Sequence, residues 1–141
     1  MQVRQERTNW RDEGLSERHR LWGWDCPAID IDFLALEYNR GKAVALVEYK
    51  NEHARKQDYN HPSYRALVDL GDKATLPVFV CRYSDNFMRW EIDPIGKVAT
   101  RKFEEHKIPS RVTLTEKRYV KFLYWLRGAE APPEVLEQLN G

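Results

Sequence analysis

Two neighbouring apolar runs dominate the hydrophobic pattern in the first half of the chain. Residues 29–38 and 43–50 are both rich in Ile, Val, Leu, Phe and Tyr, and the turn-forming sequence Asn39-Arg40-Gly41 lies between them. Runs of β-branched and aromatic residues on either side of such a turn predict a β-hairpin. Both faces of these strands carry apolar side chains, which is typical of strands that are buried on both sides.

Apolar residues at helical spacing predict a helix on either side of this hairpin. The first covers residues 16–22, with Ser16 as its N-terminal cap and Gly23 as its end. The second has Pro62 in its first turn, and we expect it to end near Lys73.

A second pair of strands follows. Residues 76–83 and 87–93 have the composition of strands, and the polar residues 84–86 between them are typical of a turn. The order of helix, two strands, helix, two strands and helix then predicts an α/β or α+β fold around one mixed sheet. The length and the absence of repeats lead us to expect a single domain over residues 1–141.

The C-terminal region, at about residues 113–139, is expected to be helical. Thr113 and Glu116 have the spacing of a capping box, and apolar residues then recur at helical spacing up to Gly128. The sequence Pro132-Pro133 can begin a last short helix that runs through Leu139. We interpret the apolar stripe of the longer helix as core packing.

The overall charge does not indicate a nucleic-acid-binding protein, because 23 basic residues balance 22 acidic ones and leave a net charge of +1. Any surface for DNA must therefore be a local patch. The arginines of the first twenty residues are one candidate for phosphate contacts, although a solvated basic face is the simpler interpretation: Arg4, Arg7, Arg11, Arg18 and Arg20.

The two cysteines and the apolar content suggest a reduced, soluble protein of the cytoplasm. Cys26 and Cys81 lie far apart and form neither a zinc motif nor a disulfide framework. The N-terminal residues lack the apolar core of a signal peptide, and no apolar run reaches the roughly 18 residues of a membrane helix.

Acidic residues interrupt the apolar pattern at one end of the first hairpin. If the turn centres on Arg40, Asp32 lies opposite Glu48 and Asp30 lies opposite Lys50, with Cβ atoms about 5 Å apart in each pair. Carboxylates at the end of buried strands are costly unless they are paired, hydrogen-bonded or bound to a cation. A structural salt bridge between Lys50 and the aspartates is the alternative interpretation.

Two adjacent carboxylates suit Mg²⁺ or Mn²⁺, which prefer oxygen ligands and accept substrate phosphate in the same coordination shell. Such an ion can activate water for attack on a phosphodiester and can neutralise developing negative charge. Lys50 projects from the same face as Glu48 and can hold that water or a phosphate oxygen.

The sequence around these residues resembles the PD-(D/E)XK nuclease superfamily, which includes Holliday junction resolvases, restriction endonucleases and phage recombination nucleases. Asp32 at the start of an apolar strand and the tripeptide Glu48-Tyr49-Lys50 carry the resemblance. It implies a restriction-endonuclease-like αβββαβ core over about residues 16–93 and catalysis by Asp32, Glu48 and Lys50. It also implies that Asp32, Glu48, the backbone carbonyl of Tyr49 and Glu17 of the preceding helix bind Mg²⁺ or Mn²⁺.

One departure from the family pattern leaves an alternative open. Ile31, and not proline, precedes Asp32, while Pro27 lies three residues before Asp30. A turn shifted by one residue would place Asp30 opposite Glu48 and make it the metal ligand instead. We favour Asp32 because the hydrophobic run begins directly after it.

These observations lead us to expect a divalent-metal-dependent deoxyribonuclease. An endonuclease that acts on branched or duplex DNA as a homodimer is our first interpretation, with the aromatic C-terminal helix as a candidate interface. The alternative is an inactive member of the same fold that binds nucleic acid or a protein. Weaker site candidates follow the tripeptide, where a surface or capping role is the simpler explanation: His53, Gln57, Tyr59, His61 and Tyr64.

Overall fold

The computed structural model describes residues 13–22, 29, 31–56 and 58–141. The chain divides into two compact units, Met1–Asp30 and Ile31–Gly141, and each is considered by itself. In the first unit, α1 spans Glu13–Leu21. The predicted start of this helix at residue 16 is wrong. Ser16 is a buried residue inside the helix and not its N-terminal cap. Gly23, its predicted end, lies outside the described residues.

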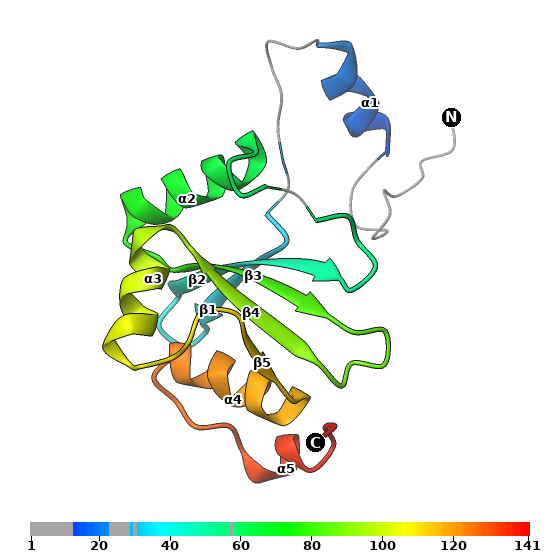
Figure 1. Cartoon of the computed structure of the whole chain (residues 1–141). Coiled ribbons are helices and arrows are strands. Elements are labelled where there is room, and N and C mark those ends of the chain that lie inside the picture. The colour runs from blue at the N-terminus through cyan, green and yellow to red at the C-terminus, as the bar shows by residue number, and fades with distance from the viewer. Residues whose placement is uncertain (1–12, 23–28, 30, 57) are drawn as a thin grey trace. The chain divides into compact units, whose positions relative to one another are not determined.

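The second unit is built on a five-stranded mixed sheet with the strand order β1-β2-β3-β4-β5 (Figure 1). β2 and β3 run parallel, and the other neighbouring strands are antiparallel. With helices on both faces of this sheet, the predicted mixed α and β class is confirmed. The strands span Phe33–Glu37 (β1), Lys42–Asn51 (β2), Val78–Tyr83 (β3), Trp90–Ile95 (β4) and Val112–Leu114 (β5).

The β1–β2 hairpin forms at the predicted turn, although β1 begins at Phe33 and not at residue 29 as predicted. Its pairing runs from Phe33 opposite Val47 to Ala35 opposite Ala45, and the register then shifts by one residue at a bulge. Gly41 in the turn has a φ of 61°, a conformation that glycine adopts without steric cost.

The expectation that both strands of this hairpin are buried on both faces is correct only for β2. Ala45, Leu46 and Val47 are buried, whereas the apolar side chains of β1 at Phe33 and Leu34 remain about half exposed. The difference arises because β1 is the edge strand of the sheet, while β2 has a neighbour on each side.

α2 (Pro62–Ala74) connects β2 to β3 and covers one face of the sheet. Pro62 starts this helix as predicted, and the His61 side chain caps it by accepting a hydrogen bond from the Ser63 amide. One compact apolar cluster joins the helix to the sheet: Leu46, Tyr64, Leu67, Val78, Val80 and Ile95.

α3 (Gly96–Glu105) and α4 (Glu116–Leu126) pack on the opposite face, and the core residues there are Ala45, Val47, Phe79, Cys81, Ile92, Ala99, Phe103, Tyr119 and Leu126. The sequence pattern predicts neither α3 nor β5. The predicted capping box is also wrong: Thr113 lies in β5, and Thr115 caps α4 by accepting a hydrogen bond from the Arg118 amide.

The chain ends in a short helix, α5 (Pro133–Leu136), which begins as predicted but stops three residues earlier. In the part of the chain that the structure describes, each helix is too short or too polar to cross a membrane.

Candidate functional site

Asp32 and Glu48 meet at the end of the β1–β2 hairpin. Phe33 is paired with Val47, so one further step along the two chains brings Asp32 beside Glu48, as the sequence predicts. The Oδ2 atom of Asp32 accepts a hydrogen bond of 3.1 Å from the backbone amide of Tyr49. This bond fixes the Asp32 carboxylate against β2, although Asp32 itself lies just before the first residue of β1.

Lys50 completes the group on the same face of β2. Its Nζ atom lies 3.5 Å from Oε1 of Glu48, and the two side chains are 28% and 14% exposed. Largely buried charges of opposite sign at this distance interact more strongly than a surface pair. Lys50 is thus held next to the two carboxylates.

The Glu48 carboxyl has an unusual proton affinity. Burial raises its pKa to about 7, and the negative charge of Asp32 adds to the rise, while the positive charge of Lys50 opposes it. Glu48 also shares a hydrogen bond with Asp32. Two carboxyl groups that compete in this way are stabilised as anions when a cation binds between them.

The side chain of Tyr49 lies on the opposite face of the sheet, as alternation along a strand requires. Its hydroxyl hydrogen-bonds to that of Tyr119, and its ring makes an edge contact with Phe33 at 5.0 Å between centroids. These contacts anchor β2 to the core under α4. They hold the strand so that Glu48 and Lys50 face the other side.

The pair of carboxylates lies where the apolar part of the sheet gives way to a polar part. Glu48 is level with Val80 of β3, which belongs to the apolar cluster under α2. Two residues further along the strands, Lys50 is level with Arg82 of β3 and Glu91 of β4. Arg82 and Glu91 are not among the predicted site residues, although a charged residue within a strand is a signal for them.

The chemistry of these donors fits Mg²⁺ or Mn²⁺. The two carboxylates offer hard oxygen ligands, and neither a thiol nor an imidazole belongs to the group formed by Asp32, Glu48 and Lys50. The rise in the pKa of Glu48, caused first by burial and then by the charge of Asp32, is a second observation in favour, because a bound cation would stabilise the ionised form that this environment disfavours.

Two further predicted ligands do not belong to the described part of the second unit. Glu17 is an exposed residue of α1 and belongs to the first unit, whereas Asp32 and Glu48 belong to the second. Its role as a metal ligand stays a prediction. Asp30, the alternative to Asp32, lies outside the described residues.

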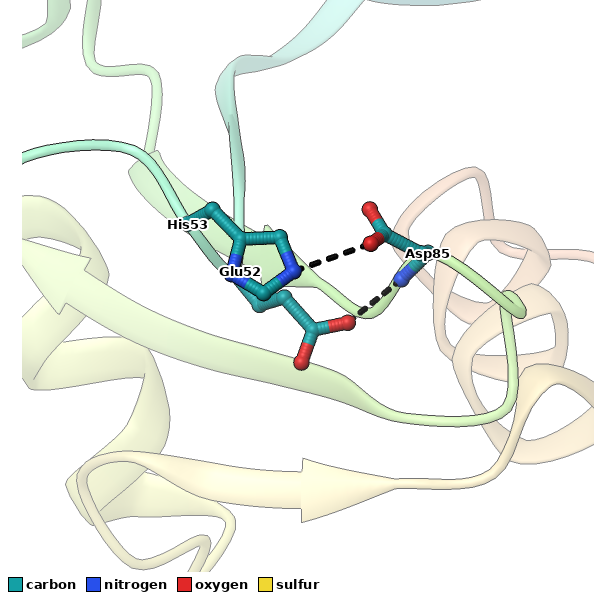
Figure 2. A group of neighbouring side chains, drawn as sticks. All are labelled: Glu52, His53 and Asp85. Atoms are coloured by element: carbon teal, nitrogen blue, oxygen red, sulfur yellow. Dashed lines mark hydrogen bonds and ion pairs between the residues drawn. The ribbon is translucent and has the colours of Figure 1, made fainter.

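Another cluster of metal-ligand types joins Glu52 and His53 to Asp85 in the β3–β4 turn (Figure 2). Its carboxylate oxygens are already engaged by protein donors. The Asp85 oxygens accept hydrogen bonds from Asn51 at 2.7 Å and pair with His53 at 2.9 Å, while Glu52 accepts from the Asp85 amide and pairs with Arg89. We interpret the cluster as a clasp that ties the end of β2 to the β3–β4 turn.

The remaining candidates have structural contacts. His61 caps α2, Tyr64 is buried in the apolar cluster under α2, and the hydroxyl of Tyr59 donates a hydrogen bond to Asp93. Gln57 lies outside the described residues, as do Cys26 and three of the N-terminal arginines, Arg4, Arg7 and Arg11.

Comparison of the chain with models of protein families, with curated proteins and with solved structures finds no match. The geometry of Asp32, Glu48 and Lys50 is therefore the basis for proposing a function.

Proposed function

We propose that the protein is a divalent-metal-dependent nuclease of the PD-(D/E)XK type that hydrolyses phosphodiester bonds in DNA. The observation that carries the proposal is the meeting of Asp32 and Glu48 beside Lys50 at the border of the apolar cluster under α2. Structural ion pairs also occur at such places, but a single lysine does not balance two adjacent carboxylates. Both carboxyl groups can be ionised together only with a further positive charge beside them, which a bound cation would supply.

Each residue has a distinct part in the proposed reaction. Asp32, Glu48 and the backbone carbonyl of Tyr49 would hold Mg²⁺ or Mn²⁺, which when bound supplies Lewis-acid activation of water and neutralises charge on the phosphate. Lys50 orients the attacking water or a phosphate oxygen through its ammonium group. The amide of Tyr49 keeps Asp32 in place through its hydrogen bond.

The fold supports the proposal in part. The described elements β1, β2, α2 and β3 follow the ββαβ order of the later part of the core that the family resemblance implies. In that core a third strand would precede α2, whereas the described residues before α2 form two strands. The proposal therefore depends more on the site than on the topology.

We propose branched or duplex DNA as the substrate and endonucleolytic cleavage as the reaction, with a homodimer as the functional form. The apolar residues of α4, which were the candidate dimer interface, are used for packing within the protein. Phe122 and Leu123 of this helix already pack against the core, which confirms their interpretation as core residues.

A cleavage assay tests the proposal. Supercoiled plasmid, linear duplex, single strands, RNA and a four-way junction are incubated with the protein and Mg²⁺ or Mn²⁺. We expect metal-dependent cutting of DNA that falls by about 100-fold or more in Lys50→Ala, as for removal of a group that stabilises the transition state. Lys42→Ala is the matched control, because Lys42 is an exposed residue at the other end of the same strand.

The opposite outcome is equally informative. If the folded wild-type protein cuts none of these substrates with either metal, the nuclease proposal is wrong. An inactive member of the same fold that binds nucleic acid or a protein would then be favoured.

A further inference from the structure

A polar cleft lies on the same face of the sheet as Glu48. Its volume is about 270 Å³, and its floor is formed by Val80 and Arg82 of β3 with Glu91 and Asp93 of β4. The register places Glu48, Val80 and Asp93 side by side on three neighbouring strands. Since neighbouring strands are about 4.8 Å apart, Asp93 lies roughly 10 Å across the sheet from Glu48.

Two tyrosines and an arginine form the walls of this cleft. The rings of Tyr59 and Tyr64 are in edge contact at 5.3 Å, and the hydroxyl of Tyr59 donates a hydrogen bond to Asp93. Arg111 approaches the same Asp93 oxygen at 3.4 Å. The cleft is thus already formed and held by its own hydrogen bonds, as is usual for small-ligand sites.

Arg82, a residue of the cleft floor, is hydrogen-bonded to the chain segment that follows the candidate active-site residues. Its Nη1 atom donates hydrogen bonds to the backbone carbonyls of Asn51 at 3.0 Å and Ala54 at 2.9 Å. These carbonyls belong to the segment that directly follows the Glu48-Tyr49-Lys50 tripeptide. One side chain therefore connects the cleft to the strand that carries the candidate catalytic residues.

The charges of the lining point to the class of ligand. Three cationic side chains are balanced by three anionic ones, and the six are Lys56, Asp58, Arg82, Glu91, Asp93 and Arg111. A surface that follows a phosphate backbone has an excess of cations, which this cleft lacks. Balanced charge, with hydrogen-bond donors and acceptors beside the accessible ring of Tyr59, suits a nucleobase, which is uncharged and presents both donors and acceptors on its edge.

We propose that this cleft receives one unpaired nucleobase of the DNA strand whose phosphate lies at Asp32, Glu48 and Lys50. The inference rests on the proposed nuclease function and makes it more specific. A base is taken from the helix most easily where it is mismatched or already single-stranded. The cleft therefore selects DNA with an unpaired base, such as a branch or a bulge, over an uninterrupted duplex.

Binding of two matched oligonucleotides in EDTA tests this inference without any cleavage. One is a fully paired duplex, and the other contains one additional unpaired base; fluorescence anisotropy gives both dissociation constants. We expect wild-type protein to bind the second roughly tenfold more tightly, as for a base that gains an aromatic contact. Tyr59→Ala and Arg111→Ala should remove this preference, whereas Tyr38→Ala, at the exposed β1–β2 turn, should retain it.

A cross-link to the wild-type protein covers the case in which Tyr59→Ala fails to fold. With 5-iododeoxyuridine as the unpaired base, irradiation should attach the DNA to the segment that contains Tyr59 and Tyr64. Equal affinity for the two duplexes together with cross-links outside this segment would overturn the inference. If deoxynucleoside monophosphates alone bind in a Tyr59-dependent manner, the ligand is a free nucleotide and its assignment to a DNA strand is wrong.

The cleavage assay separates this inference from the proposed function. Metal-dependent cutting that requires Lys50 but shows no preference for an unpaired base would overturn the inference alone. A preference for the unpaired base without any cutting would support the cleft as a nucleobase site and contradict the proposed nuclease activity.

Discussion

The backbone amide of Tyr49 and the side chain of Asp32 form a 3.1 Å hydrogen bond across the first hairpin, between residues 17 positions apart in the chain. The bond uses one oxygen of Asp32 to fix the carboxylate. It engages the main chain of the same tripeptide whose side chains, at Glu48 and Lys50, form the rest of the candidate site. Position and charge of Asp32 can therefore be changed separately by mutation.

We expect Asp32→Asn to remove metal binding while the fold is retained. An asparagine side chain can still accept the hydrogen bond from the Tyr49 amide, but it lacks the negative charge that attracts a cation. Asp32→Ala should in addition lower the free energy of unfolding by about 1–3 kcal/mol, because a polar group of the backbone loses its partner. Calorimetric titration with Mn²⁺ and urea unfolding measure the two effects, and equal stability of the two variants would contradict the role of the hydrogen bond.

The pKa of Glu48 predicts how stability changes with pH in the absence of metal. The ordinary pKa is 4.5, and burial with the Asp32 charge raises it to about 7 in the folded protein. Between these pH values the folded protein keeps a proton that the unfolded chain has lost. The free energy of unfolding should therefore fall as the pH rises through this window, by an amount on the order of 2 to 3 kcal/mol.

Urea unfolding in EDTA at pH 5 and pH 8 measures this effect. Glu48→Gln should lose the part of the pH dependence that comes from Glu48, because the amide does not titrate. Glu105→Gln, at an exposed position of α3, is the control and should behave as the wild type does. If the free energy of unfolding changes by the same amount between pH 5 and pH 8 in wild type and in Glu48→Gln, Glu48 does not hold the additional proton.

His53→Ala is expected to leave metal binding unchanged. The cluster of Glu52, His53 and Asp85 uses its carboxylate oxygens for hydrogen bonds and ion pairs within the protein. We expect the affinity for Mn²⁺ to change by less than about twofold, well below the roughly 10–100-fold effect of disturbing even the support of a metal ligand. A large loss in His53→Ala but not in Asp32→Asn would move the metal site to the clasp.

Gly71→Ala should destabilise the protein although alanine favours helices. A Cβ atom at this position of α2 would lie 2.6 Å from Cγ2 of Val78 and 2.7 Å from the backbone oxygen of Leu76. The backbone cannot move away at low cost, so we expect a loss of about 1–3 kcal/mol in the free energy of unfolding. Ala66→Ser, on the exposed side of the same helix, is the control for a change that meets no neighbour, and an unchanged urea midpoint for Gly71→Ala would show that the helix can shift.

The first hairpin could be predicted because its information is local. A turn at Arg40 with an apolar run on each side fixes the pairing, and the observed register follows it through Ala35. The bulge after Ala35 could not be predicted, since it depends on how the edge strand bends against its neighbour. It lies on the turn side of the hairpin, so the pairing next to Asp32 is unaffected.

The missed elements lack the usual signals in the sequence. α3 begins directly after β4, its first residue is Gly96 and its N-terminal cap, Ile95, makes no side-chain hydrogen bond. Few apolar residues mark its buried side, and Ala99 and Phe103 are the ones that reach the core. β5 has only three residues, which is too short for an alternating pattern to stand out.

The residues around the candidate site also include some that could be predicted from the sequence and some that could not. Asp32, Glu48 and Lys50 belong to one hairpin and could be brought together by counting along the sequence. Arg82 and Asp93 reach this face only through the parallel pairing of β2 with β3, which depends on the crossover through α2. No local pattern specifies that register.

The two carboxylates of the candidate site differ in how local opening of the structure would reach them. Glu48 lies in β2, which pairs with β3 along its second half, so amide hydrogens there should exchange with solvent only when the sheet itself opens. Asp32 lies outside the β1 ladder, and its carboxylate is held by contacts with the Tyr49 amide and with Glu48. Slow amide exchange at Glu48 and faster exchange at Asp32 would indicate that one carboxylate is fixed and the other can move. An ion or a product would then enter and leave the site on the side of the edge strand β1.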